Sequence, residues 1–153
     1  MTTPVASKPL PAGWPRISAS LAVANASAAI EFYCTAFGFE VRLRVDGDAG
    51  RVEHSELVLG GGLIMVGDPA PEKGRPWVRT PKSLDGANTQ QMMVYVDDVE
   101  AHCARARAAG AVITTEPKTT DYGDDYWSDR AYEAMDPDGH RWYFTQRLKT
   151  LGK

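Results

Sequence analysis

Two residues of this sequence have the types and the spacing of a catalytic or metal-binding pair. His54 and Glu56 lie two positions apart in the segment 52–59, which has the composition of a β-strand. Side chains at that spacing point to the same face of a strand, so the pair could bind a cation or act as a general base and its orienting acid. The alternative is structural, with His54 hydrogen-bonded to a neighbour and Glu56 in solvent, because two ligands without a third do not make a specific metal site.

Aromatic side chains in two loop segments form a second group able to bind a ligand. Rings on long loops commonly line the rim of a pocket, because they bury a large area at low entropic cost. The segment 121–129, rich in both aromatic and acidic residues, favours a cationic or planar ligand. In the alternative, the rings pack the loops onto the protein or form a dimer contact. The predicted rim residues are Trp77, Tyr122, Tyr126 and Trp127.

The composition is typical of one globular domain and excludes several classes of partner. With 153 residues, 43% of them hydrophobic, the chain is long enough to bury a core without a structural metal or disulfide. The formal net charge is −3 and the basic residues are scattered, which argues against nucleic acid and anionic membranes as partners. No apolar run is long enough to span a bilayer, and residues 1–11 lack the apolar region of a secretory signal, so we expect a cytoplasmic protein.

The predicted elements repeat once along the chain. Residues 1–15 are rich in proline and predict an extended arm, followed by a first module at 16–66, a connecting loop at 67–90, a second module at 91–147 and a tail at 148–153. Each module reads as a strand, a helix with a polar N-cap and a glycine stop, and three further strands. We expect His102, on the second helix, to lie on the surface or to pack against the helix, and His140 to help set the turn at 136–139. Because one such βαβββ unit leaves a sheet face uncovered, the two modules should share one α+β domain with its ligand site in a concavity.

Four phrases, in this order along the chain, resemble the vicinal oxygen chelate superfamily, which includes glyoxalase I, the bleomycin-resistance proteins and the extradiol dioxygenases. They are Ala-Ile-Glu-Phe-Tyr with Phe-Gly-Phe at 29–39, His-Ser-Glu-Leu at 54–57, Val-Tyr-Val-Asp-Asp-Val at 94–99, and Tyr-Gly with Asp-Pro-Asp-Gly-His-Arg-Trp at 122–142. The resemblance covers residues 16–147. It implies two βαβββ modules that form a pseudo-symmetric, cup-shaped sheet, commonly completed across a homodimer.

The resemblance also implies where a metal would be held. In the enzymes of that superfamily, His, Glu or Gln side chains from the first and last strands of the modules bind a divalent cation. The corresponding positions here fall on Ser18, Met65, Met93 and Tyr143, none of which carries an imidazole or a carboxylate. We therefore expect no cofactor and no metal, and a soft, apolar lining made by Met65, Met93 and Tyr143.

Three functions remain open on the sequence alone. The first is a binding or sequestering protein that holds a hydrophobic or aromatic small molecule in a metal-free cup, with ligand contacts from the residues of that lining, the four rim residues and His54. The second is a metal-dependent lyase, isomerase or dioxygenase with a displaced site at His54 and Glu56. The third is a non-catalytic domain whose cup is filled by its own side chains and which acts through protein contacts.

Overall fold

The computed structural model describes residues 9–70 and 73–150 and contains two βαβββ modules in succession. The first module consists of β1 (Ala19–Ala22), α1 (Ala26–Phe32), β2 (Glu40–Asp46), β3 (Val52–Leu59) and β4 (Gly62–Gly67). The second consists of β5 (Met92–Tyr95), α2 (Val99–Ala108), β6 (Val112–Asp121), β7 (Ser128–Met135) and β8 (Arg141–Lys149). Helix α1 continues as a π-helix, η1 (Tyr33–Phe37), and two short 3-10 helices follow at η2 (Asp48–Gly50) and η4 (Pro81–Leu84).

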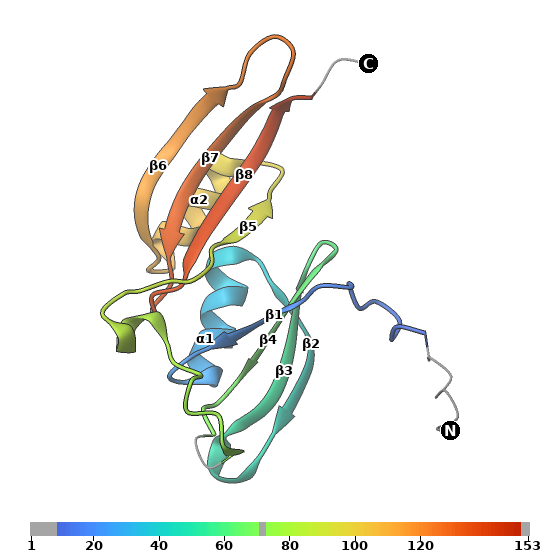
Figure 1. Cartoon of the computed structure of the whole chain (residues 1–153), viewed down its shortest axis with the longest axis vertical. Coiled ribbons are helices and arrows are strands. Elements are labelled where there is room, and N and C mark those ends of the chain that lie inside the picture. The colour runs from blue at the N-terminus through green and yellow to red at the C-terminus, as the bar shows by residue number, and fades with distance from the viewer. Residues whose placement is uncertain (1–8, 71–72, 151–153) are drawn as a thin grey trace, which may run out of the picture.

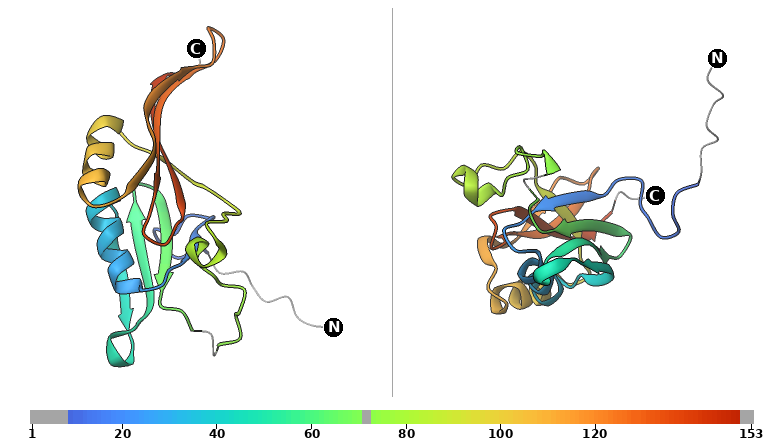
Figure 2. Two further views of the ribbon diagram at one scale, coloured as in Figure 1. Left: turned by 90° about the vertical axis from the view of Figure 1, so that its left-hand side faces the viewer. Right: turned by 90° about the horizontal axis from the view of Figure 1, so that it is seen from below.

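Each module forms its own four-stranded mixed sheet. The strand orders are β1-β4-β3-β2 in the first sheet and β5-β8-β7-β6 in the second, with the first pair of each parallel and the others antiparallel. Within the described residues no strand of one sheet pairs with a strand of the other. The sheets follow one another along the long axis of the molecule (Figure 1), and both helices lie on the same side of them (Figure 2, left). The predicted α+β class and the internal repeat are confirmed.

The repeat extends to the way each helix begins. Asn25 and Asp98 cap α1 and α2 by accepting hydrogen bonds from the backbone N–H groups of Ala28 and Ala101. A side chain just beyond the paired part of β4, Asp68, accepts from the N–H of Ala26, the first residue of α1. The equivalent side chain of β8, Gln146, accepts from the N–H of Val99, the first residue of α2. Each module thus fixes its helix to its last strand by the same device.

The core lies between the helices and the sheets and joins the two modules. At its centre the ring of Phe37, from η1, is 4.8 Å from that of Phe144 and 5.0 Å from that of Trp142, both on β8. Trp142, Tyr33, Tyr132, Phe37 and Phe144 are the largest side chains that are almost completely buried. Because residues of both modules fill one continuous core, neither module has a separate one.

The turn between β7 and β8 ties the second module to the first through polar contacts. The buried carboxylate of Asp136 accepts hydrogen bonds from the Tyr33 hydroxyl at 2.7 Å and from the Trp142 indole N–H at 2.9 Å. Asp138 accepts from the Ala24 N–H, and His140 Nε2 donates to the carbonyl of Ala22. His140 therefore does more than set its turn, because it links that turn to the end of β1.

Two strands differ from the expected pattern. The alternation in 39–45 predicts a half-buried strand, but every residue of β2 is exposed, including Val41, Leu43 and Val45 at 42–46%. The reason is a β-bulge between Val41 and Leu43 in an edge strand that has a neighbour on one side only. In the second module β6 runs on to Asp121 through Pro117, since an edge strand with register shifts between Ile113 and Lys118 tolerates a residue that cannot donate to the ladder.

The strand extensions shorten the predicted loop at 121–129 to residues 122–127. The backbone N–H of Tyr122 donates to the carbonyl of Trp127 and closes this loop as a tight hairpin. In the part of the chain that the structure describes, no helix is long and apolar enough to cross a membrane.

Candidate functional site

The candidate site lies on the face of the second sheet that is turned away from the helices, which we call the open face. Strand alternation decides which side chains lie there: Met92 and Val94 pack against the core, whereas Met93 and Tyr95 are 49% and 54% exposed. Met93 pairs with Tyr143 on β8, and Glu133 on β7 pairs with Tyr143 from the other side. The open face includes Met93 and Tyr95 on β5, Asp129, Ala131 and Glu133 on β7, and Arg141, Tyr143, Thr145 and Arg147 on β8.

An arginine stacked with two aromatic rings forms one end of the open face. The guanidinium carbon of Arg147 lies 5.5 Å from the ring centre of Tyr95 and 5.3 Å from that of Trp127. Its Nε donates to the buried carboxylate of Asp129 at 2.6 Å, and its Nη2 donates to the Tyr95 hydroxyl. The arginine is held on three sides, so the two rings are held with it, and Tyr95 still presents half of its surface to solvent.

The middle of the open face contains Tyr143. Burial raises the pKa of its phenol, and the neighbouring Tyr122, Asp129 and Glu133 raise the pKa further through their charges. Tyr143 is therefore a neutral phenol at physiological pH. Two residues further along β8, the hydroxyl of Thr145 is buried and has no hydrogen-bond partner among the described residues.

The other end of the open face is hollowed. A shallow hollow of about 440 Å³, open to solvent, is lined by two strand residues, Glu133 and Arg141, and by the chain that leads into β5, residues 88–91. That chain is held in place because the side-chain nitrogen of Asn88 donates to the carbonyl of Gly139 at 3.0 Å. All six lining residues, Asn88, Thr89, Gln90, Gln91, Glu133 and Arg141, are polar, in contrast to the aromatic end.

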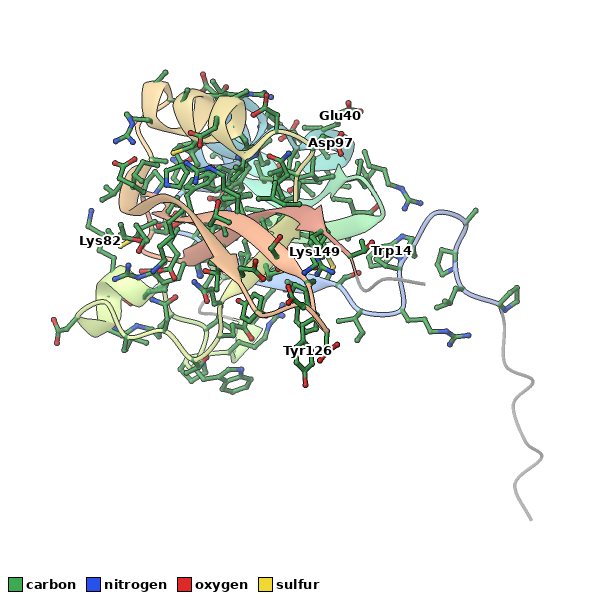
Figure 3. All side chains as sticks on the ribbon, turned by 90° about the horizontal axis from the view of Figure 1, so that it is seen from above. Trp14, Glu40, Lys82, Asp97, Tyr126 and Lys149 are labelled. Atoms are coloured by element: carbon green, nitrogen blue, oxygen red, sulfur yellow. The ribbon has the colours of Figure 1, made fainter. Side chains whose placement is uncertain are left out.

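Six sequence-predicted ligand contacts lie in the connecting loop and the second module, and the structure brings four of them together and leaves Tyr126 and Trp77 apart. Met93 lies opposite Tyr143, and the ring of Tyr122 is 5.3 Å from that of Trp127. Tyr126 touches only the edge of Trp127 and projects into solvent (Figure 3). Trp77 is 72% exposed on the connecting segment and contacts no other ring among the described residues. The predicted acidic rim is partly neutralised, because Asp129 pairs with Arg147 and Asp124 lies 3.9 Å from Lys149.

Sequence reasoning missed Tyr95 and Arg147, although a signal for each was present. Tyr95 is two residues from Met93 in a short strand, and Arg147 is four residues from Tyr143. Strand alternation therefore places Tyr95 on the same face as Met93, and Arg147 on the same face as Tyr143. Their joint role depends on a contact between two strands, which the spacing in the sequence does not reveal.

In the first module His54 and Glu56 lie next to each other, but Glu56 also forms an ion pair with an arginine. His54 Nε2 and Glu56 Oε1 are 3.3 Å apart on one face of β3. Glu56 is buried, not solvated as the structural alternative expected, and Arg42 Nε lies 3.4 Å from its other oxygen. Arg42 in turn donates to the carbonyl of Ala12 and faces the ring of Trp14 on the arm (Figure 3). The Glu56 charge is thus balanced by a guanidinium from the neighbouring strand.

The residues present do not fit a divalent metal ion. In the second sheet, Met93 and Tyr143 form the second residue pair of the parallel β5-β8 ladder. The second pair of the corresponding β1-β4 ladder is Ser20 and Met65, so the counterpart of Met93 is Ser20 and not Ser18. Ser18 lies just before β1, with its hydroxyl buried and unpartnered among the described residues. None of these side chains is an imidazole or a carboxylate, and no group of three His, Cys, Asp or Glu in the described parts of the chain could hold a metal.

Comparisons with known proteins agree with this architecture. The model of the Glyoxalase/Bleomycin resistance protein/Dioxygenase superfamily matches residues 16–144. An uncharacterized protein of Mycobacterium bovis is 34% identical over 137 residues, which cover 90% of this chain and 86% of that protein. Among solved structures, TioX from Micromonospora sp. ML1 is 30% identical with a TM-score of 0.63, covering 86% of this chain and 98% of TioX. TnmS3 from Streptomyces sp. CB03234, described as an antibiotic binding protein, is 22% identical with a TM-score of 0.61 and covers 88% of this chain and 97% of TnmS3.

Proposed function

Because the chain belongs to the glyoxalase/bleomycin resistance protein/dioxygenase superfamily, we propose that it binds an aromatic small molecule on the open face of its second sheet without a metal ion. The observation that carries the proposal is the arginine-aromatic stack at Tyr95, Trp127 and Arg147, which continues into Tyr143 and Met93. Exposed rings that are already held in place bind a planar ligand without paying for their own ordering. Small-molecule binding is supported by TnmS3, a protein of the same fold that is described as an antibiotic binding protein.

The proposal includes a homodimer in which a second copy completes the cup. In one chain the open face is uncovered, and the outer edges of β1 and β5 have no strand beside them in the described residues. Exposed apolar side chains lie at or near these edges, among them Ile17, which is 90% exposed, and Met93. Exposed apolar side chains at unpaired strand edges favour an interface there. A partner there would enclose a ligand that one open sheet only supports.

Binding of a simple probe tests the function. Isothermal titration calorimetry with 2-naphthol is expected to show one site per chain in the unaltered protein. Trp127→Leu should raise the dissociation constant about tenfold, because a stacked ring contributes on the order of 1 kcal/mol. Trp77→Leu is the matched control, since Trp77 lies outside the site, and it should leave the affinity unchanged. Equal losses in both variants, or no binding at all, would contradict the proposal.

Metal content tests the proposal that the ligand binds without a metal ion. Protein purified without nickel affinity resin should contain no stoichiometric metal, and Ni²⁺, Zn²⁺, Mn²⁺, Fe²⁺ or Co²⁺ should not raise its melting temperature. A ligand that binds the folded state must raise that temperature by mass action. One metal ion per chain, with a thermal shift that His54→Ala abolishes, would instead favour a metal-dependent enzyme with a displaced site at His54 and Glu56.

A further inference from the structure

The hollow at the end of the open face contains one guanidinium and one carboxylate that no other side chain uses. Arg141 and Glu133 are both half-buried, and neither makes a hydrogen bond or an ion pair within the described residues. On β7 and β8 two further charged side chains of the open face, Arg147 and Asp129, are paired with each other. The uncommitted charges of these two central strands therefore lie where the sheet is hollowed, beside the amide side chains of Gln90 and Gln91.

A guanidinium and a carboxylate that line the same cavity present donors and an acceptor side by side. An ionised carboxylate only accepts hydrogen bonds and a guanidinium only donates them. A ligand group with an adjacent acceptor and donor satisfies both, and a neutral carboxamide has this arrangement: its carbonyl accepts from Arg141 and its N–H donates to Glu133. A carboxylate leaves Glu133 facing a like charge, and an ammonium leaves Arg141 facing one, so each is disfavoured.

The hollow is close enough to Tyr143 and Met93 for one small ligand to contact both. Arg141 and Tyr143 are alternate residues of β8 on the same face, which separates them by about 7 Å along the strand. Glu133 pairs directly with Tyr143 across the sheet. A bicyclic ring lying over Tyr143 and Met93 therefore places a substituent of one or two bonds at the mouth of the hollow.

We propose that this hollow recognises the polar end of the ligand and that this end is a carboxamide-type group attached to a planar aromatic ring. The inference rests on the proposed function, which places the ring on the open face. It departs from the cationic preference that the acidic loop at 121–129 suggests. The acids of that loop belong to the far end of the open face, where Arg147 and Lys149 face them.

A matched series of naphthalene probes tests the inference. The affinities of 2-naphthamide, 2-naphthoate, 2-naphthylmethylammonium and 2-naphthol are measured by calorimetry on the full-length protein at constant salt. The amide is expected to bind about tenfold more tightly than either charged analogue, as a site with two opposite charges rejects a ligand that pairs with only one of them. Arg141→Met and Glu133→Met should each remove the preference for the amide, measured within each variant as the ratio of the 2-naphthamide affinity to the 2-naphthol affinity.

Lys118→Met serves as the matched control, because it removes an exposed charge from β6 of the same sheet without touching the hollow. It should alter none of the four affinities by more than about twofold, the range expected of an exposed charge. Equal binding of all four probes, tightest binding of either charged probe, or a preference that survives both substitutions would overturn the inference and leave the proposed function intact. Failure of every probe, 2-naphthol included, would overturn the proposed function itself.

Discussion

At the scale of single residues, Asp136 is the most heavily used side chain of the protein. Its carboxylate is 3% exposed, and its two oxygens accept from Tyr33, Trp142 and the backbone N–H groups of Asp138 and His140. A buried charge is tolerable when hydrogen bonds replace the water it has lost. Burial and the adjacent Asp136 raise the pKa of the Tyr33 hydroxyl well above its usual value, so Tyr33 remains a donor at any physiological pH.

We expect Tyr33→Phe to destabilise the protein by about 1–3 kcal/mol, because it leaves a buried carboxylate oxygen with one partner fewer. Chemical denaturation followed by circular dichroism measures this. Tyr126→Phe removes the same hydroxyl from an exposed position and should change the free energy of unfolding by less than about 0.5 kcal/mol. Similar effects of the two substitutions would show that the contact between Tyr33 and Asp136 does not stabilise the fold.

His102 is the second residue whose environment has a measurable consequence. Its Nε2 lies 3.0 Å from the carbonyl of Phe37, which only accepts, so Nε2 carries the hydrogen and Nδ1 accepts from the Tyr132 hydroxyl at 2.6 Å. Burial lowers the pKa of the imidazole, and the nearby Arg105 lowers it further, although the bond to Phe37 acts in the opposite direction. His102 is therefore a neutral, partly buried side chain that links α2 to η1 and β7, which goes beyond the surface position or helix packing expected of it.

The lowered pKa of His102 predicts a loss of stability in mild acid. As the pH is lowered through about 6.5, the unfolded chain takes up a proton at His102 before the folded protein does. The free energy of unfolding therefore decreases as the pH is lowered, until the lowered pKa of the folded protein is reached. The contribution of one group is at most about 1.4 kcal/mol per pH unit. Denaturation between pH 7.5 and 5 measures the slope, and His102→Gln should flatten it. An unchanged slope in that variant would contradict the assignment.

At the scale of elements, a side chain of α2 forms hydrogen bonds to the C-terminal end of the first helix. Arg105 of α2 donates from Nε and Nη2 to the carbonyls of Thr35 and Cys34, both at 2.7 Å. These carbonyls belong to η1, whose last turn lacks hydrogen-bond partners within the helix. The π-helical turn at the end of α1 is thus completed by a side chain from the other module, which positions Phe37 in the common core.

Arg105→Met is expected to cost about 1–3 kcal/mol of stability, because two helix-end carbonyls lose charged donors. Arg107→Met is the control on the same helix. It breaks an exposed ion pair with Glu116, and such pairs contribute about 0–1 kcal/mol. Thermal denaturation of the two variants side by side measures the difference. A larger loss in Arg107→Met than in Arg105→Met would contradict the capping role.

At the scale of the whole molecule, the chain has one shared core and two uncovered sheet faces. Its helices and core side chains bury one face of each sheet, whereas the open face of the second sheet and the exposed β2 of the first remain in solvent. Unpaired edge strands and exposed aromatic side chains of this kind are usually covered in the functional assembly. The candidate site lies on such a face, so assembly and binding are expected to be linked.

We expect sedimentation equilibrium to give twice the chain mass of 16.7 kDa at micromolar concentration. Ile17→Asp should raise the dimer dissociation constant at least about tenfold, since burying an isoleucine contributes on the order of 1.5–3 kcal/mol. Leu10→Asp, on the arm away from β1, should leave it unchanged. A monomer at every concentration would contradict the dimer, and addition of 2-naphthol would then test whether the ligand alone drives association.

The local sequence determined most of the fold, because the signals involved act over a few residues. Asn25, Gly38, Asp98 and Gly110 mark the helix boundaries of both modules, and composition and alternation predict strands at 52–59, 91–96 and 141–147, which the structure has at 52–59, 92–95 and 141–149, so that β8 runs two residues into the predicted tail. The two cases that differ, β2 and β6, are edge strands with bulges. Their conformation is set by having one neighbour instead of two, which the local pattern does not record.

The candidate site was only half determined by the sequence. The resemblance located Met65, Met93 and Tyr143, residue type excluded them as metal ligands, and the prediction that they line a ligand site agrees with the exposure of Met93. The tertiary structure decided which side chains meet: Arg147 between Tyr95 and Trp127, Glu56 beside Arg42, and Arg141 with Glu133 at the hollow. These contacts join residues from different strands, and their energies depend on register and distance, which exist only once the sheet has formed.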